Sequence, residues 1–166
     1  MNEEILILVK TLFRVLGERK LTLTTAESCT GGLLAATITT VAGSSAYFDR
    51  GFIVYSNISK VEELDVSPKT IEIFGAVSNE TAAAMAQGAL AHSYASISIA
   101  ITGIAGPEGA TPRKPLGTVS FAVAYADGIK SITRHFSGNR EQIRKRTVKF
   151  ALELLLDIVK NIPNES

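Results

Sequence analysis

The stretch TTAESCTGGLLAA, Thr24–Ala36, joins a β-like segment to an apolar, helix-like one. The segment LTLTTA, residues 21–26, alternates as a strand does, and residues 31–41 have the apolar content of a short helix. Between them lie a carboxylate, two hydroxyls, a thiol and two glycines. Such a turn is either the cap of a helix or the seat of a nucleophile, and the residues alone leave both interpretations open.

Helix-like and strand-like segments alternate along the rest of the chain. The first predicted helix begins at Ile5 and stops at Gly17, and the last covers most of 137–161. Three further helices are expected: one capped by Asn57, one that begins at Pro68 and one capped by Ser78. Strands are expected over 51–56, over 96–102 and on both sides of Asp127-Gly128. One connection has the signature of a hairpin, whereas the others have the length of helical crossovers. The sequence therefore predicts a single α/β domain over residues 1–166, with three α/β/α layers and a mixed, mostly parallel sheet.

Composition narrows the classes of function. The 166 residues include 46% hydrophobic residues, which is enough for a core without disulfides, and the single cysteine cannot form an internal disulfide. A formal net charge of +1 argues against bulk electrostatic binding to nucleic acid or to a membrane surface. No apolar run is long enough to span a bilayer, and the acidic N-terminus is unlike a signal peptide. We expect a cytoplasmic protein that binds a small ligand.

Ser28 is the first candidate nucleophile. It follows a predicted strand and precedes a predicted helix, where unpaired N–H groups and the helix dipole would stabilise an oxyanion. Gly31 and Gly32 are poor choices for helix stability but allow a substrate to approach the backbone closely. Cys29 is the competing nucleophile, although a lone cysteine also packs well as a small buried hydrophobe.

A serine nucleophile needs a base. His92 and His135 both lie in segments of structural character, so a Ser-His-Asp triad is disfavoured, and their spacing from Cys29 does not suit zinc. Lys60 falls in the first turns of a predicted helix, where the dipole and burial would both lower its pKa toward that of a useful base. Tyr55, at the end of the preceding strand, could relay a proton; a surface lysine and a strand-end tyrosine are the simpler interpretation.

Two further features suit an anionic ligand. The loop TGIAGPEGA, residues 102–110, follows a strand and exposes backbone amides at its glycines, but it matches no standard phosphate-binding motif. Arg140 and Arg144 lie one turn apart near the start of the last predicted helix, where the dipole disfavours cations unless they meet an anion such as a phosphate. A plain surface loop and solvated arginines are the alternatives.

Taken together, the segments TAESCTGG, GFIVYSNISK, GAVSNETAAAMAQGA, AITGIAGPEGATPRKPLGTV and GNREQIR closely resemble the nicotinamide-nucleotide amidohydrolase family, also known as the CinA C-terminal domain. The resemblance runs in order from about Leu8 to Val159 and suits the stand-alone form of that domain. Ala42 and Ala110 depart from the residues often found in the family, proline and glycine, and Ala110 therefore predicts a stiffer or differently shaped loop. Neither position belongs to the expected catalytic set.

The resemblance implies hydrolysis of nicotinamide mononucleotide to nicotinate mononucleotide and ammonia, without metal or cofactor, by Ser28, Lys60 and Tyr55. With the chemical arguments above, it places the substrate near Thr30, Gly31, Gly32, Thr102, Gly103, Ala105, Gly106, Gly109, Arg140 and Arg144. It also implies a homo-oligomer, such as a dimer, with no nucleic-acid or membrane partner. The rival hypothesis is a non-catalytic nucleotide-binding or assembly module with the same fold, which the glycine-rich loop would serve equally well.

Overall fold

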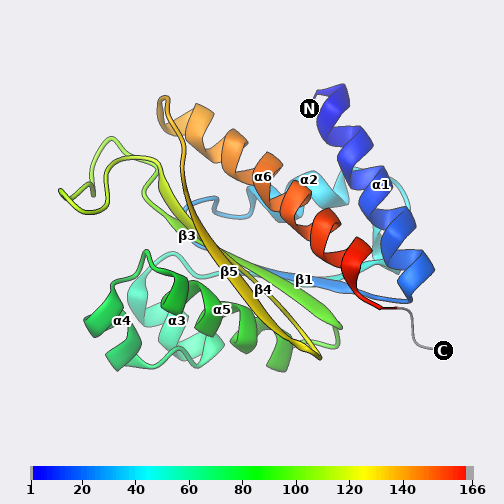
Figure 1. Ribbon diagram of the computed structural model, residues 1–166, viewed down its shortest axis with the longest axis horizontal. Coiled ribbons are helices and arrows are strands. Elements are labelled where there is room, and N and C mark those ends of the chain that lie inside the picture. The colour runs from blue at the N-terminus through cyan, green and yellow to red at the C-terminus, as the bar shows by residue number, and fades with distance from the viewer. Residues whose placement is uncertain (1, 164–166) are drawn as a thin grey trace.

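Strands that are buried on both faces form the centre of the molecule. The computed structural model describes residues 2–163, which form a five-stranded sheet in the order β2-β1-β3-β4-β5 (Figure 1). The strands are β1 (Leu23–Glu27), β2 (Phe48–Ile53), β3 (Ile97–Gly103), β4 (Thr118–Tyr125) and β5 (Gly128–His135). Adjacent pairs among β2, β1 and β3 are parallel, whereas β4 is antiparallel to both neighbours. The sheet is thus mixed and mostly parallel at its centre, as predicted.

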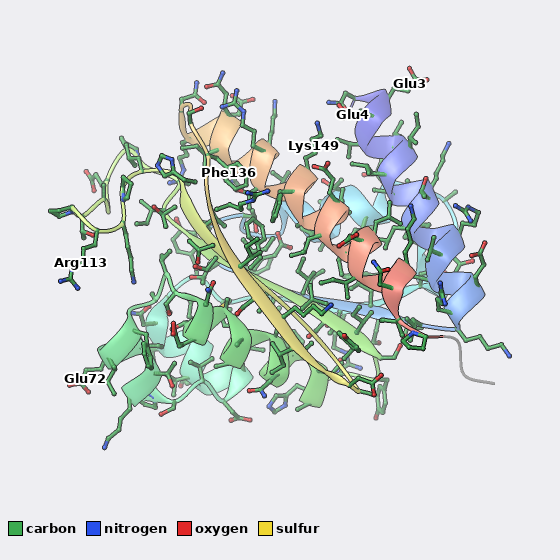
Figure 2. The ribbon with its side chains drawn as sticks, viewed as in Figure 1. Glu3, Glu4, Glu72, Arg113, Phe136 and Lys149 are labelled. Atoms are coloured by element: carbon green, nitrogen blue, oxygen red, sulfur yellow. The ribbon has the colours of Figure 1, made fainter. Side chains whose placement is uncertain are left out.

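Helices cover both faces of this sheet (Figure 1). One layer contains α1 (Glu3–Arg19), α2 (Leu33–Thr39) and α6 (Arg140–Asn161), and the other contains α3 (Asn57–Leu64), α4 (Pro68–Phe74) and α5 (Asn79–Ala91); a short 3-10 turn, η1 (Ser44–Ala46), precedes β2. A salt bridge between Glu4 of α1 and Lys149 of α6, 2.7 Å long, joins two helices of the first layer (Figure 2). The predicted three-layer α/β/α architecture is confirmed.

The two faces of β3 explain how the layers differ. Ile97, Ile99 and Ile101 pack into the core beneath α1, α2 and α6, whereas Ala100 faces the small-residue core beneath α3 and α5. On that second face the Ser98 hydroxyl donates a 2.6 Å hydrogen bond to the Ala86 carbonyl of α5. Small side chains on both partners let the alanine-rich α5 lie close to the sheet, and the large apolar side chains fill the other layer.

Several predicted boundaries move by a few residues. The first helix passes Gly17 and ends at Arg19, and its C-cap residue Lys20 adopts the left-handed conformation with φ 56°. The second helix begins at Leu33 rather than Gly31, because Gly31 and Gly32 have φ of 56° and 101°. The strand expected over 51–56 is Phe48–Ile53, and Ser56 rather than Asn57 caps α3. Pro68, Ser78 and the Asp127-Gly128 hairpin lie as predicted.

The chain order creates a crevice at the carboxyl ends of β1 and β3. From β1 the chain crosses to β2 on one side, and it then returns through α3, α4 and α5 to β3 on the other side. In α/β sheets ligands bind where successive crossovers diverge in this way. No helix within residues 2–163 combines the length and the apolar character needed to cross a bilayer.

Candidate active site

A cavity of about 210 Å³ opens at this crevice. Its walls come from the turn after β1, the start of α3, the α4–α5 connection, the loop after β3 and the start of α6: Ser28, Cys29, Tyr55, Asn57, Lys60, Ala76, Val77, Thr102, Gly103, Ile104, Ala105, Gly106, Glu108, Gly109 and Arg140. A larger groove of about 710 Å³ lies between α1, α2 and α6, but it contains neither Ser28 nor Lys60. The chemistry of the smaller cavity makes it the candidate site.

Ser28 and Lys60 meet inside the smaller cavity. The Lys60 ammonium nitrogen lies 3.1 Å from the Ser28 hydroxyl oxygen, although 32 residues separate them in the chain. The Lys60 side chain is 1% exposed, and Ser28 is 7% exposed. The candidate nucleophile and the candidate base therefore lie within hydrogen-bond reach of one another and are largely shielded from solvent.

Backbone carbonyls hold the Lys60 amine in position. Lys60 Nζ donates to the carbonyls of Val54 and Tyr55, both at 3.1 Å, and to that of Ser56 at 3.5 Å. Burial lowers the pKa of Lys60 below its ordinary value of 10.5 because desolvation penalises the charged form. A neutral amine can satisfy the Val54 and Tyr55 carbonyls with its two N–H groups and still direct its lone pair toward Ser28.

Glu27, not Ser28, provides the acceptor at the start of α2. Its carboxylate accepts from the N–H of Leu34 at 2.8 Å and from that of Ala35 at 3.1 Å, and it is 1% exposed. The N-cap position belongs to Gly32, which has no side chain to contribute. The Ser28 hydroxyl therefore does not cap α2. It contacts Lys60 at 3.1 Å and donates to the Tyr55 carbonyl at 3.4 Å, so it stays a candidate nucleophile.

Removing this carboxylate should destabilise the fold. We expect Glu27→Ala to lower the free energy of unfolding by about 2–4 kcal/mol, because two buried N–H groups lose a charge-assisted acceptor, and Glu27→Gln to cost roughly half as much. Urea denaturation of both variants measures the loss. The exposed Glu18→Ala serves as control and should change stability by less than about 0.5 kcal/mol. Equal losses for Glu27→Ala and Glu18→Ala would exclude the capping assignment.

Tyr55 lies at the mouth of the cavity. Its side chain is 59% exposed, and its hydroxyl oxygen accepts a 3.0 Å hydrogen bond from Arg140 Nη2. Its backbone carbonyl is one of the acceptors for Lys60. Tyr55 thus contacts the buried Lys60 through its main chain and Arg140 at the entrance through its side chain.

Arg140 and the loop after β3 form the opposite wall. Arg140 Nη1 donates to the Gly106 carbonyl at 2.7 Å, so this guanidinium joins the loop to Tyr55. The Thr102 hydroxyl donates to the Ala76 carbonyl at 2.7 Å. At Gly103 a methyl group would lie 2.7 Å from Val119 Cγ2 and 3.1 Å from Cys29 Sγ, so only glycine fits between these walls.

The expected site residues divide into two groups. Ser28, Tyr55 and Lys60 line the cavity, and so do six of the expected substrate-binding residues: Thr102, Gly103, Ala105, Gly106, Gly109 and Arg140. Thr30, Gly31, Gly32 and Arg144 do not line it. Arg144 instead donates to the carbonyls of Cys29 and Thr30, at 3.2 and 2.8 Å. This differs from the arrangement expected for a phosphate ligand.

Other lining residues were not singled out from the sequence. Asn57, Ala76, Val77, Ile104 and Glu108 all reach the cavity. Asn57 was expected only as a helix cap, and Ala76 and Val77 carry no polar side chain that could have identified them. Their proximity follows from the way the α4–α5 connection folds over the end of β3, which no local pattern encodes.

Cys29 has the properties of a packed side chain. It is 5% exposed, and burial raises the pKa of its thiol to about 12, although the cations of Arg144 and Lys60 act in the opposite direction. A thiol in this state is not ionised near neutral pH and is a poor nucleophile.

We therefore expect Cys29→Ala to keep kcat within about threefold of the unmodified protein, because only the buried thiol is lost. Steady-state kinetics of the amide hydrolysis that the family resemblance implies measures kcat, with a circular dichroism spectrum as the check on folding. A loss of activity by Cys29→Ala comparable to that of Ser28→Ala would identify the thiol as the nucleophile.

The histidines lie elsewhere. His92 Nε2 lies 2.6 Å from Asp65 Oδ2, and His135 belongs to β5; neither lines the cavity. Within residues 2–163, no group of three or more His, Cys, Asp or Glu side chains could hold a metal ion.

The fold and the site define an α/β protein that carries a buried Ser–Lys pair at the carboxyl ends of parallel strands. The family model described as CinA C-terminal domain matches residues 6–159, so the chain belongs to the CinA C-terminal domain family. The predicted family is confirmed.

Named relatives support this assignment. The nicotinamide-nucleotide amidohydrolase PncC of Escherichia coli K12 is 45% identical over 156 residues, which cover 93% of this chain and 94% of that protein. A putative competence-damage inducible protein of Caldicellulosiruptor saccharolyticus is 49% identical over 154 residues, but this match covers only 38% of its length. The crystal structure of competence/damage inducible protein CihA from Agrobacterium tumefaciens superposes with a TM-score of 0.91 at 42% identity, covering 95% of this chain and 97% of that chain.

Proposed function

We propose that this protein hydrolyses the carboxamide of nicotinamide mononucleotide, giving nicotinate mononucleotide and ammonia for pyridine-nucleotide recycling. The observation that carries the proposal is the 3.1 Å contact between Lys60 Nζ and Ser28 Oγ in a buried cavity where the lysine pKa is lowered. The name of the Escherichia coli relative supports the choice of substrate.

The first half of the reaction forms an acyl-enzyme. Neutral Lys60 takes the hydroxyl proton of Ser28, and the serine oxygen attacks the carboxamide carbon. The carbonyl π electrons move to oxygen, where backbone N–H groups of the turn after β1 stabilise the negative charge. The tetrahedral intermediate collapses as the C–N bond breaks, and the leaving nitrogen takes the proton from Lys60 and departs as ammonia.

The second half regenerates the serine. Lys60, neutral again, takes a proton from water as the water oxygen attacks the ester carbonyl. Collapse of this intermediate breaks the ester bond, the serine oxygen recovers its proton from Lys60, and nicotinate mononucleotide leaves. The Tyr55 hydroxyl accepts from Arg140 and keeps its own hydrogen, so it can donate a hydrogen bond to the nitrogen that leaves in the first half, while the proton itself comes from Lys60.

The size of the cavity suggests that it encloses only part of the substrate. Its volume of about 210 Å³ is below the ~300–1,000 Å³ typical of sites that enclose a whole drug-sized ligand. We place the pyridine carboxamide inside and the ribose phosphate at the mouth. Arg140, which lines the entrance and has a forked guanidinium, is the candidate phosphate ligand.

The test is hydrolysis by purified protein with a chelator present. We expect nicotinate mononucleotide and ammonia in equal amounts, with a rate that the chelator does not change. Coupled detection of ammonia and chromatography of the nucleotide measure both products. Binding of the nucleotide by calorimetry with no product after long incubation would instead favour the non-catalytic module, and loss of activity with the chelator would contradict metal independence.

A further inference from the structure

Arg144 lies behind the turn that carries Ser28 rather than in the cavity. From α6 its Nε donates to the Cys29 carbonyl at 3.2 Å, and its Nη2 donates to the Thr30 carbonyl at 2.8 Å. The guanidinium therefore holds two consecutive carbonyls in one direction. Such a bidentate grip needs the rigid fork of arginine.

Because the peptide bond is planar, fixing a carbonyl also fixes the direction of the N–H group in the same peptide. Within residues 2–163 the only cis peptide is Gly106-Pro107, so the Cys29–Thr30 and Thr30–Gly31 bonds are trans, and each N–H points opposite to its carbonyl. The N–H groups of Thr30 and Gly31 must then point away from Arg144. That of Gly31 reaches the Ser28 carbonyl at 3.0 Å, which shows that this direction leads back toward Ser28.

Three N–H groups of this turn, those of Cys29, Thr30 and Gly32, have no hydrogen-bond acceptor among residues 2–163. Gly31 N–H is satisfied by Ser28, and Leu34 N–H and Ala35 N–H are satisfied by Glu27. Of the three groups without an acceptor, only the Thr30 N–H belongs to a peptide whose carbonyl, that of Cys29, is held by Arg144. A backbone donor held in place beside a nucleophile is the element from which oxyanion holes are built.

The charge of Arg144 acts at the same place. Its cation lowers the pKa of the Cys29 thiol against the larger effect of burial, so its positive potential reaches the residue next to Ser28. A cation bonded to a carbonyl also polarises the N–H of the same peptide and makes it a stronger donor. The direction of the Thr30 N–H and its polarisation by Arg144 would therefore both stabilise an oxyanion beside Ser28.

We propose that Arg144 is a positioning residue of the reaction, which aims and polarises the Thr30 N–H as a donor to the oxyanion formed when Ser28 attacks. Thr30 is not among the residues that line the cavity, but it directly follows Ser28 and Cys29, which are. This inference rests on the proposed function. The proposed positioning role replaces the phosphate-binding role that the spacing of Arg140 and Arg144 predicted for Arg144.

Steady-state kinetics of Arg144→Ala and Arg144→Lys on nicotinamide mononucleotide test the assignment. Loss of one oxyanion donor lowers kcat by about 10²–10³, so misdirecting it should lower kcat by about 10- to 100-fold in Arg144→Ala while KM stays within about threefold. Arg144→Lys keeps a charge without the fork and should lie between. Added guanidinium at millimolar concentration should partly restore kcat of Arg144→Ala only. Lys145→Ala, which removes a neighbouring exposed cation of α6, should match the unmodified protein.

Each outcome is informative. A raised KM with unchanged kcat in Arg144→Ala would return Arg144 to phosphate binding, and unchanged kcat and KM would equally overturn the proposal. If the unmodified protein does not hydrolyse the nucleotide, the proposed substrate fails. The inference is then judged by the rate at which a fluorophosphonate labels Ser28, which should fall by a similar factor in Arg144→Ala. Should Arg144→Ala not fold, Arg144→Lys gives the same two readouts.

Discussion

Ser28→Ala should reduce hydrolysis of nicotinamide mononucleotide by about 10⁴- to 10⁶-fold in kcat, the loss found when the nucleophile of a comparable covalent hydrolase is removed. The change deletes the hydroxyl oxygen of a residue that is 7% exposed, and this oxygen contacts Lys60 at 3.1 Å. Lys60 keeps its three backbone acceptors, so the fold should lose no more than about 1 kcal/mol of stability. Single-turnover assays at high enzyme concentration measure a rate this low.

The same variant separates catalysis from binding. Because no part of the ribose phosphate is expected to contact Ser28, the affinity of Ser28→Ala for the nucleotide in calorimetry should stay within about threefold of the unmodified protein. A Ser28→Ala protein that retains a tenth or more of the original kcat, while folded by circular dichroism, would show that the hydroxyl is not the nucleophile.

Lys60→Met should lower kcat by about 10³- to 10⁴-fold, near the upper end of the contribution of general acid–base catalysis. Methionine approximates the length of lysine but cannot accept a proton. Lys60→Arg is the sharper variant: it keeps donors for the Val54 and Tyr55 carbonyls, yet a guanidinium stays protonated and cannot act as a base. Both variants should show a loss of this size. Substantial turnover by Lys60→Arg would exclude lysine as the base.

The dependence of the reaction on pH follows from the direction of the Lys60 shift. Burial lowers the pKa of Lys60 below 10.5, and the reactive form is the neutral amine. The neutral fraction grows as pH increases, so kcat/KM should rise with pH through the lowered pKa and level off above it, at lower pH than an exposed lysine would allow. Initial rates across the range measure the profile. A kcat/KM that falls as pH increases through this range would contradict a lysine base.

Neighbouring residues show where sequence reasoning succeeded and where it failed. The alternation in 96–102 and the helical spacing of the opening segment predict their elements because burial of one face imposes a period that the sequence must carry. The start of α2 was placed two residues early, since the left-handed conformations of Gly31 and Gly32 are set by the turn as a whole. Tyr55 was expected to end a strand, yet β2 stops at Ile53.

Arg140 and Arg144 illustrate the same limit within one helix. Their spacing of four residues predicts a shared face and a shared ligand. In the folded chain Arg140 contacts Gly106 and Tyr55, whereas Arg144 contacts Cys29 and Thr30. Two side chains one turn apart on a helix lie about 5–6 Å from each other, and long side chains easily reach different neighbours from such positions.

The sequence by itself determined the order of helices and strands, the layered α/β class and, through several motifs in order, the family. These depend on local periodicity and on residues close together in the chain. Only the tertiary structure decided that Ser28 faces Lys60, because Glu27 takes over the cap of α2 and the crossover to β2 brings a helix from 32 residues away. Burial then lowers the lysine pKa, and burial belongs to the assembled fold rather than to any segment of it.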